Sequence, residues 1–159
     1  MNKKILTATI LMCGALLTVW CNKIMKPTGW DPQVCNEAKC FSVEVADTPK
    51  ELTQWLMWVD QMAADEGMLF VFDNLGWNKF WMKNTLIPLD MLWLAEDGEV
   101  LYMKEYAPPC GEEASKNNDC QLFGPPEGTL AKYVLEVNAN TARELGISEG
   151  TQLGIYNID

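Results

Sequence analysis

A lysine and an aspartate stand in an otherwise apolar stretch of this chain, the segment Phe80–Asp90. Charge in apolar surroundings costs free energy unless it is paired, and a desolvated lysine can act as a base or as a Schiff-base amine. Lys83 and Asp90 are therefore the candidate catalytic residues, with Asp90 as the partner of the amine. The favoured alternative is a structural ion pair across the turn between them, which would set the register of two strands.

Neighbouring polar and aromatic side chains extend this pair into a candidate binding site. Glu136 could join Asp90 in a two-carboxylate site of the glycosidase type. Their spacing in the sequence does not set their separation, and we expect Glu136 to face solvent. Tryptophans in a strand-rich chain, such as Trp58 and Trp93, more often pack in the core than stack on a ligand, whereas Trp77, in a predicted turn, should be exposed. The predicted ligand-binding residues are Trp81, Lys83, Asn84, Thr85, Asp90 and Glu136.

Composition excludes several classes of function. The chain contains no histidine, which excludes Ser-His-Asp and Cys-His catalysis and any histidine-ligated metal. The formal net charge is −10, and because an acidic surface repels phosphate backbones we expect no nucleic-acid partner. The charge is better explained as a solvated surface that keeps the protein soluble. No metal site and no cofactor are predicted, and the expected partner is a small molecule of unknown identity.

Four cysteines predict two short disulfide loops, Cys35–Cys40 and Cys110–Cys120. Neither pair has the C-x-x-C spacing that is typical of a zinc knuckle or of a redox-active pair. Disulfides form and persist in oxidising compartments outside the cytoplasm. In an exported chain these cysteines are therefore expected to be structural.

Residues 1–21 predict a signal peptide or a membrane anchor. Lys3 and Lys4 precede sixteen uncharged residues, Ile5–Trp20, which is the arrangement of an export signal. Cleavage and retention are both open, and lipidation of Cys21 is a third alternative, against which the large Trp20 counts. All three alternatives predict an extracytoplasmic location, periplasmic or at the cell surface, with the protein either secreted or attached to the membrane by this segment.

The rest of the chain predicts a linker at 22–39 and one β-rich domain at 40–159. Thr48-Pro49-Lys50-Glu51 is a capping box with proline at the first helical position, and it predicts a helix of about ten residues. A second short helix should follow Asn138, and Asp97-Gly98 predicts a hairpin. Apolar and alternating runs predict strands at 41–45, 67–72, 80–83, 87–94, 100–106, 132–137 and 151–158.

This pattern favours a mainly β fold. Several short strands and two short helices, with no regular alternation of strand and helix, predict a compact and mostly antiparallel β-sandwich or barrel. An α+β fold is the alternative.

Several of these segments together resemble the bacterial and archaeal family called domain of unknown function 192. The likeness depends above all on Trp-Met-Lys-Asn-Thr at 81–85 and Pro-Leu-Asp at 88–90, and it extends over about residues 41–157. The resemblance implies a β-rich, sandwich-like single domain that is often exported, and it assigns no activity. The segment Trp55–Val59 lacks the glycine and the arginine that members usually carry there. Any role of that arginine toward a buried carboxylate or an anionic ligand is therefore in doubt here.

Polar chemistry concentrated in one apolar segment, without a recognisable nucleophile–base set, favours a binding module. The expected ligand is a small polar or saccharide-like molecule of the cell envelope. One alternative is an envelope enzyme that uses a carboxylate or a lysine, and whether any reaction is catalysed stays open. A second alternative is a structural or partner-binding domain. A single cleft that holds both Asp90 and Glu136 would favour the enzyme.

Overall fold

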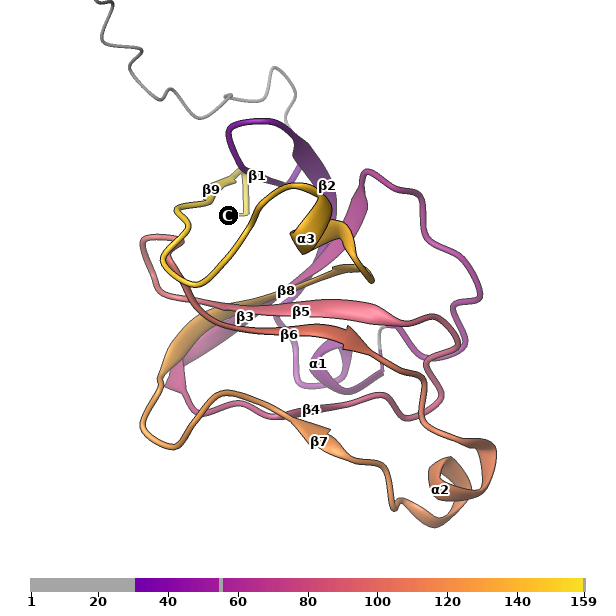
Figure 1. Cartoon of the computed structure of the whole chain (residues 1–159). Coiled ribbons are helices and arrows are strands. Elements are labelled where there is room, and N and C mark those ends of the chain that lie inside the picture. The colour runs from indigo at the N-terminus through magenta and orange to yellow at the C-terminus, as the bar shows by residue number, and fades with distance from the viewer. Residues whose placement is uncertain (1–30, 55, 159) are drawn as a thin grey trace, which may run out of the picture.

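The computed structural model describes residues 31–54 and 56–158, so the predicted signal or anchor at 1–21 lies outside the described part of the chain. That part contains nine strands and three short helices, whose arrangement is shown in Figure 1. The strands are β1 (Gln33–Cys35), β2 (Cys40–Ala46), β3 (Glu66–Gly76), β4 (Phe80–Trp81), β5 (Leu89–Leu94), β6 (Val100–Ala107), β7 (Leu122–Phe123), β8 (Ala131–Asn138) and β9 (Gly154–Tyr156). The helices are α1 (Glu51–Gln54), α2 (Glu112–Asn117) and α3 (Thr141–Glu144).

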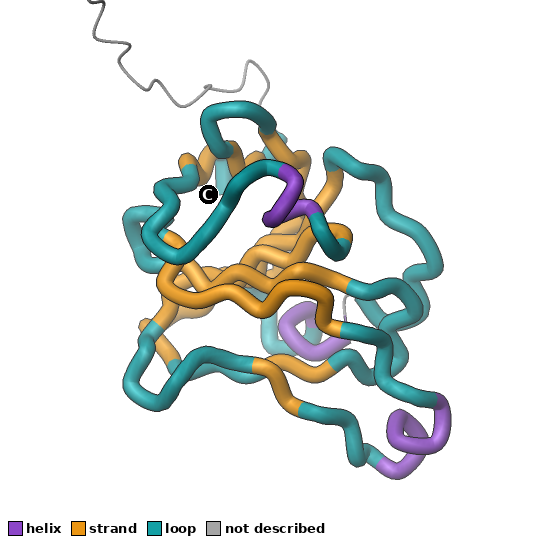
Figure 2. The backbone as a smooth tube through the Cα atoms, in the orientation of Figure 1, coloured by secondary structure: helices purple, strands orange, loops and turns teal. Residues whose placement is uncertain are grey.

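Seven strands form one curled sheet in the order β6-β5-β8-β3-β2-β1-β9. Figure 2 distinguishes the strands from the helices and the connecting loops. Neighbouring strands are antiparallel except β2 and β3, which run parallel. The two ends of the sheet meet, because Glu99 just before β6 bridges Gln152 just before β9. Beside this bridge the Leu153 N–H donates to the Gly98 carbonyl oxygen at 3.0 Å. The mainly β, mostly antiparallel fold predicted from the sequence is therefore confirmed.

The sheet separates two apolar clusters. We call the first the inner cluster, because strands from both ends of the curled sheet contribute to it; it comprises Val34, Phe41, Val43, Leu69, Leu92, Leu94, Val100, Tyr133, Leu135, Val137, Ala142, Ile147 and Leu153. The outer cluster comprises Ala46, Leu56, Met68, Phe70, Met82, Leu89, Met91, Trp93, Ala107, Phe123, Ala131 and Val134. The separate β4–β7 pair covers the outer cluster, on the side of the sheet away from α3 (Figure 1). Successive residues of β5 and β8 alternate between the clusters, so both strands are buried on both faces.

Some elements differ from the sequence prediction. Strand β1 lies in the segment 22–39 predicted as a linker, where it pairs with β2 and β9; three residues are too few for a strand pattern to be recognised. A third helix, α2, lies inside the loop closed by Cys110 and Cys120. Both predicted disulfides are confirmed.

Helix α1 begins as predicted but is much shorter. The capping box is confirmed, since the Thr48 hydroxyl donates to Glu51 Oε2 at 2.8 Å and accepts the Glu51 N–H at 3.3 Å. The helix ends at Gln54 after four residues. Shortly afterwards the Trp58 N–H donates to the Asn84 carbonyl oxygen at 2.7 Å. The chain thus leaves the helix to pair with a distant segment, which overrides the local helical preference.

The side chain of Asp90 connects helix α3 to strands β5 and β6. Its Oδ2 accepts the Ala142 N–H at 2.9 Å, and its Oδ1 accepts the Tyr106 N–H at 2.9 Å. Ala142 lies in the first turn of α3, where unpaired N–H groups favour a carboxylate. The fully buried aspartate is satisfied by backbone groups alone. The predicted ion pair between Lys83 and Asp90 is wrong, because among the described residues the one salt bridge joins Lys116 and Glu112.

We expect Asp90→Asn to lower the free energy of unfolding by about 2–4 kcal/mol. The amide supplies one acceptor oxygen where the carboxylate supplies two, so one of the two N–H groups loses its partner. Urea denaturation measures the change. Asp73→Asn, at an exposed position of β3, should change the free energy of unfolding by less than about 0.5 kcal/mol. Equal effects of the two substitutions would contradict the anchoring role of Asp90.

Candidate functional site

The two carboxylates predicted to share a site lie on opposite faces of the curled sheet. Leu89 and Met91 belong to the outer cluster, so Asp90 between them faces inward. Leu135 and Val137 belong to the inner cluster, so Glu136 faces outward. The two groups therefore cannot flank one substrate as a glycosidase pair does. The prediction that Glu136 faces solvent is also wrong, because its side chain is only 4% exposed.

Glu136 is a buried carboxyl group on the outward face of β8. Its neighbours in register are Met68 on β3 and Met91 on β5, which are both apolar. Burial in these surroundings raises the pKa of Glu136 to about 8, because water no longer solvates the anion. At neutral pH the carboxyl group is therefore protonated, and it can donate a hydrogen bond as well as accept one.

The Glu136 side chain lines a narrow cleft, which we call the Glu136 cleft. Its volume is about 50 Å³, enough for a water molecule or one functional group of a ligand. Within it Glu136 and Thr85 are buried and Trp81 is exposed, so the deep end carries a carboxyl group and a residue with a hydroxyl group. The cleft is lined by Leu52, Thr53, Gln54, Leu56, Met57, Phe70, Phe80, Trp81, Lys83, Thr85 and Glu136.

A wider hollow of about 460 Å³ adjoins this cleft, and we call it the Trp58 hollow. It is lined by Thr53, Gln54, Met57, Trp58, Lys83 and Asn84. Four of these residues also line the Glu136 cleft, so the two spaces are neighbours. The volume falls within the range of small-molecule sites. A further hollow of about 600 Å³ lies on the other side of α1, between that helix and strands β2 and β3.

Trp58 stands exposed at the edge of the Trp58 hollow in an unusual backbone conformation. Its side chain is 69% exposed, and its φ is +69°, which is rare for a bulky residue. Asn84, whose carbonyl oxygen accepts the Trp58 N–H, also has a positive φ of 57°. Strain of this kind persists only where the surrounding structure imposes it, and it concentrates at functional sites. The expectation that Trp58 packs in the core is wrong, whereas Trp93 is fully buried as predicted.

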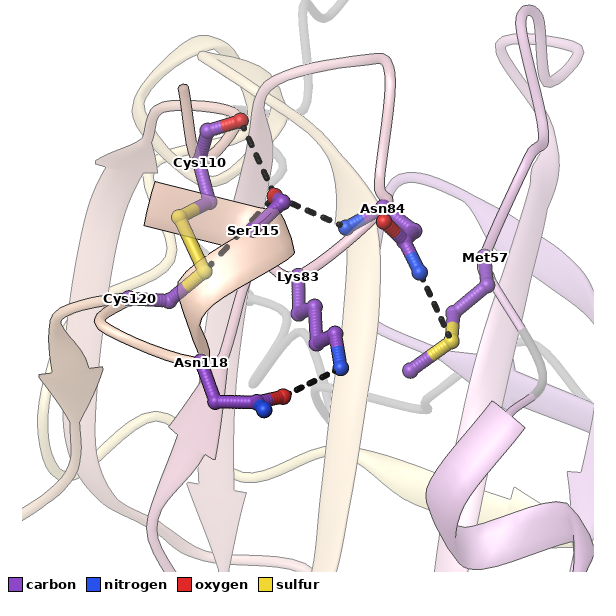
Figure 3. The surroundings of a disulfide bond; sticks show 7 residues. All are labelled: Met57, Lys83, Asn84, Cys110, Ser115, Asn118 and Cys120. Carbon is purple, nitrogen blue, oxygen red and sulfur yellow. Dashed lines mark hydrogen bonds between the residues drawn. A yellow bond between two sulfur atoms is a disulfide. The ribbon is translucent and has the colours of Figure 1, made fainter. Parts of the chain in front are cut away.

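Lys83 lies where the two spaces meet and has no acidic partner in the described part of the chain. Its ammonium group donates to Asn118 Oδ1 and lies 5.3 Å from the centroid of the Trp81 ring. Figure 3 shows the side chain of Lys83 reaching toward Asn118. A neutral amide and an aromatic face hold this cation in place, so its charge is not neutralised within the protein.

The disulfide loop 110–120 supports the turn that carries Lys83. The Cys110 N–H donates to the Met82 carbonyl oxygen at 3.1 Å, and the Asn84 N–H donates to the Ser115 hydroxyl at 3.4 Å. Together with the Asn118 contact, the loop therefore binds three consecutive residues of the turn, Met82–Asn84. Figure 3 shows Ser115 between the disulfide and Asn84.

The structure thus brings together five of the six predicted ligand-binding residues and leaves Asp90 out. Trp81, Lys83, Asn84, Thr85 and Glu136 line the two adjoining spaces. The sequence analysis missed the lining residues contributed by the segment 53–58. One signal pointed to them, the departure of the segment Trp55–Val59 from the pattern of the resembled family.

Comparison with known families identifies the fold. The model of DUF192, described as an uncharacterized ACR, matches residues 33–155. The chain belongs to this family. The DUF192 match begins at β1, so it includes residues that the resemblance alone had left out. A comparison with curated proteins finds no match.

Two solved structures resemble this DUF192 chain. One is a putative transcription regulator from Sinorhizobium meliloti 1021, with 35% identity and a TM-score of 0.66; the match covers 78% of this chain and 92% of that one. The other is a protein of unknown function from Novosphingobium aromaticivorans DSM 12444, with 29% identity and a TM-score of 0.63; the match covers 73% of this chain and 76% of that one. The family and these structures support the β-rich fold and assign no activity.

The two disulfides are consistent with an extracytoplasmic location. Within residues 31–54 and 56–158, no helix has the length and apolar character needed to cross a bilayer.

We expect Glu136 to make stability depend on pH. Its pKa is about 8 in the folded protein and near 4.5 when unfolded, so between these values only the folded state keeps the proton. Stability should therefore fall by about 1.4 kcal/mol per pH unit as pH rises through this window, and the loss should end above about pH 8. Glu136→Gln should remove this dependence, so that the difference between wild type and variant grows with pH.

Urea denaturation of both proteins from pH 5 to pH 9 checks this prediction. Lys83 is the other charged group lining the Glu136 cleft. Glu127→Gln, at an exposed position, should leave the pH profile of the wild type unchanged. A difference in the free energy of unfolding between wild type and Glu136→Gln that stays constant across the whole range would contradict the raised pKa of Glu136.

Removing the Cys110–Cys120 disulfide should loosen the turn at Met82–Asn84. On the chain-entropy model a loop of this length contributes about 3 kcal/mol to stability, so Cys110→Ala/Cys120→Ala should lose roughly that amount. Hydrogen exchange at the amide of Asn84 should accelerate, because its acceptor Ser115 is no longer fixed.

The matched control removes the other disulfide, with Cys35→Ala/Cys40→Ala. It should destabilise the β1–β2 hairpin and leave exchange at Asn84 unchanged relative to the rest of the sheet. Equal acceleration at Asn84 in both double variants would show that the loop 110–120 has no specific role in positioning Lys83.

Proposed function

We propose that this protein is an extracytoplasmic binding module for a small polar or saccharide-like ligand. One polar group of the ligand would enter the Glu136 cleft, and its body would occupy the Trp58 hollow. The observation that carries this proposal is the Glu136 carboxyl group, which is buried and lines the Glu136 cleft. Because burial keeps this group protonated at neutral pH, it can donate a hydrogen bond as well as accept one. A polar ligand group that enters the cleft could therefore form a hydrogen bond with it.

The sizes of the two spaces support the same proposal. The Glu136 cleft, at about 50 Å³, admits a single functional group, and the Trp58 hollow, at about 460 Å³, admits the body of a small molecule. Hydroxyl and amide side chains line both spaces beside exposed aromatic rings. Convergent neutral hydrogen-bonding groups beside an aromatic surface suit a polar ring ligand.

Envelope enzyme activity is a second candidate, and one observation favours it. A carboxyl group with a pKa of about 8 can serve as a general acid at neutral pH, and Lys83 lines the same cleft. Asp90 plays no part in this candidate, since it faces the inner cluster. Release of product from a ligand that binds at the cleft would distinguish an enzyme from a binding module.

The acidic net charge of this chain does not support a nucleic-acid-binding function. The Sinorhizobium structure is described as a putative transcription regulator, which suggests such a role. The net charge of −10 opposes association with a phosphate backbone. We propose instead that the protein acts in the envelope, attached to the membrane or secreted, on the basis of its two disulfides and the apolar segment at 1–21.

A thermal-shift screen of the full chain tests the binding proposal. The probes are neutral hexoses, hexuronic acids, amino acids and dipeptides at millimolar concentration, and at least one should raise Tm. A probe at a hundred times its Kd stabilises the fold by about 2.7 kcal/mol. Glu136→Met should abolish this shift. The same variant should be at least as stable as the wild type, because an apolar side chain of similar length replaces a carboxyl group buried between apolar neighbours.

A variant that is at least as stable as the wild type shows that a lost shift is not a folding defect. Glu127→Met, at an exposed position, should retain the shift of the wild type. A panel in which no probe stabilises the wild type, or a shift that persists in Glu136→Met, would count against the proposal.

A further inference from the structure

We infer that the ligand is a sugar that carries a carboxylate, a hexuronic acid, with its ring against Trp58 and its carboxylate at Lys83. This inference rests on the proposed function and names the class of ligand. It combines the exposed tryptophan of the Trp58 hollow with a feature that the binding proposal does not use, a cation without an acidic partner in the described part of the chain.

The charge of the hollow selects an anion. Lys83 is the one charged residue lining the Trp58 hollow, and among the described residues no carboxylate lies within salt-bridge distance of it. This is notable in a chain of net charge −10, where acids outnumber cations. Asn118 accepts a hydrogen bond from the ammonium group without neutralising it. A ligand carboxylate would supply the missing countercharge.

Other charged groups fit the site less well. An amine or a peptide N-terminus needs an acid, and the lining of the Trp58 hollow contains none. The acid that lines the adjoining cleft, Glu136, is protonated at neutral pH because burial raises its pKa to about 8. A phosphate carries more charge and is usually met by several cations or by a row of backbone N–H groups. One lysine matches the single charge of a carboxylate.

The remaining lining residues suit a hydroxylated ring. Trp58 is 69% exposed, and a backbone hydrogen bond of 2.7 Å to Asn84 holds its main chain in place. The apolar face of a pyranose can stack on an indole, while its hydroxyl groups bond to amides. The side-chain amides of Gln54 and Asn84 line the same hollow. A ring hydroxyl can enter the Glu136 cleft, whose volume admits one such group.

Isothermal titration calorimetry on the full chain tests this inference with two matched pairs of probes. The pairs are D-galacturonate with D-galactose, and D-glucuronate with D-glucose; acetate serves as a carboxylate without a ring. At least one hexuronate should bind tenfold or more tightly than its neutral parent and than acetate. Lys83→Met should weaken binding of that hexuronate at least tenfold and leave binding of the neutral sugar unchanged. Trp58→Ala should weaken binding of both sugars.

Two controls match these variants. Lys79 also lies over a tryptophan ring, that of Trp77, with 4.1 Å between its ammonium group and the ring centroid, and neither residue lines the two spaces. Lys79→Met and Trp77→Ala should therefore leave hexuronate binding unchanged.

Three results would overturn the inference: equal affinity for a hexuronate and its neutral parent, acetate binding as tight as that of the hexuronate, or no binding by either hexuronate. If another probe of the thermal-shift panel then binds in a Glu136-dependent manner, the binding module stands and only the class of ligand is wrong. If no probe binds, both proposals fall.

Discussion

Apolar clusters cover both faces of strands β5 and β8, and this covering determines the surroundings of the two carboxyl groups that the strands carry. Asp90 and Glu136 lie on these neighbouring strands, one facing inward and the other outward. The inward carboxylate accepts two backbone N–H groups and connects α3 to the sheet. The outward carboxyl group has only apolar neighbours in register. Asp90 is therefore a structural anchor, because two backbone N–H groups bond to it. Glu136 is instead a protonated carboxyl group that lines a cleft.

Features that depend on near neighbours in the chain could be predicted from the sequence. The capping box at Thr48 and the disulfides Cys35–Cys40 and Cys110–Cys120 are of this kind. The partners of Asp90 could not be predicted, because Ala142 is 52 residues away and contributes only its backbone N–H. Glu136 was placed on the correct face of its strand, but the cover over that face comes from distant segments around α1 and β4. Strand periodicity shows which residues share a face and not whether that face meets water.

The candidate site is assembled from segments that are far apart in the sequence. Residues 53, 54 and 56–58 come from the end of α1 and the chain just after it, the segment 80–85 includes β4, and Glu136 belongs to β8. A fourth segment, the disulfide loop 110–120, forms hydrogen bonds with the turn at Met82–Asn84 and supports it. DUF192 membership supplies the framework on which these segments are placed, and Lys83 lies in the motif on which the family resemblance depends. Trp58 lies in the segment that departs from the family pattern. Function is therefore argued from the site and not from the fold.

Closure of the curled sheet depends on the absence of a side chain at one position. Gly98 adopts a φ of +89°, and a Cβ atom there would collide with the carbonyl oxygen of Leu153, the residue whose N–H bonds to the Gly98 carbonyl. Two backbones meet at this seam with nothing between them. A larger residue would force the seam apart and give water a path to the inner cluster. At this point only backbone atoms separate the inner cluster from solvent.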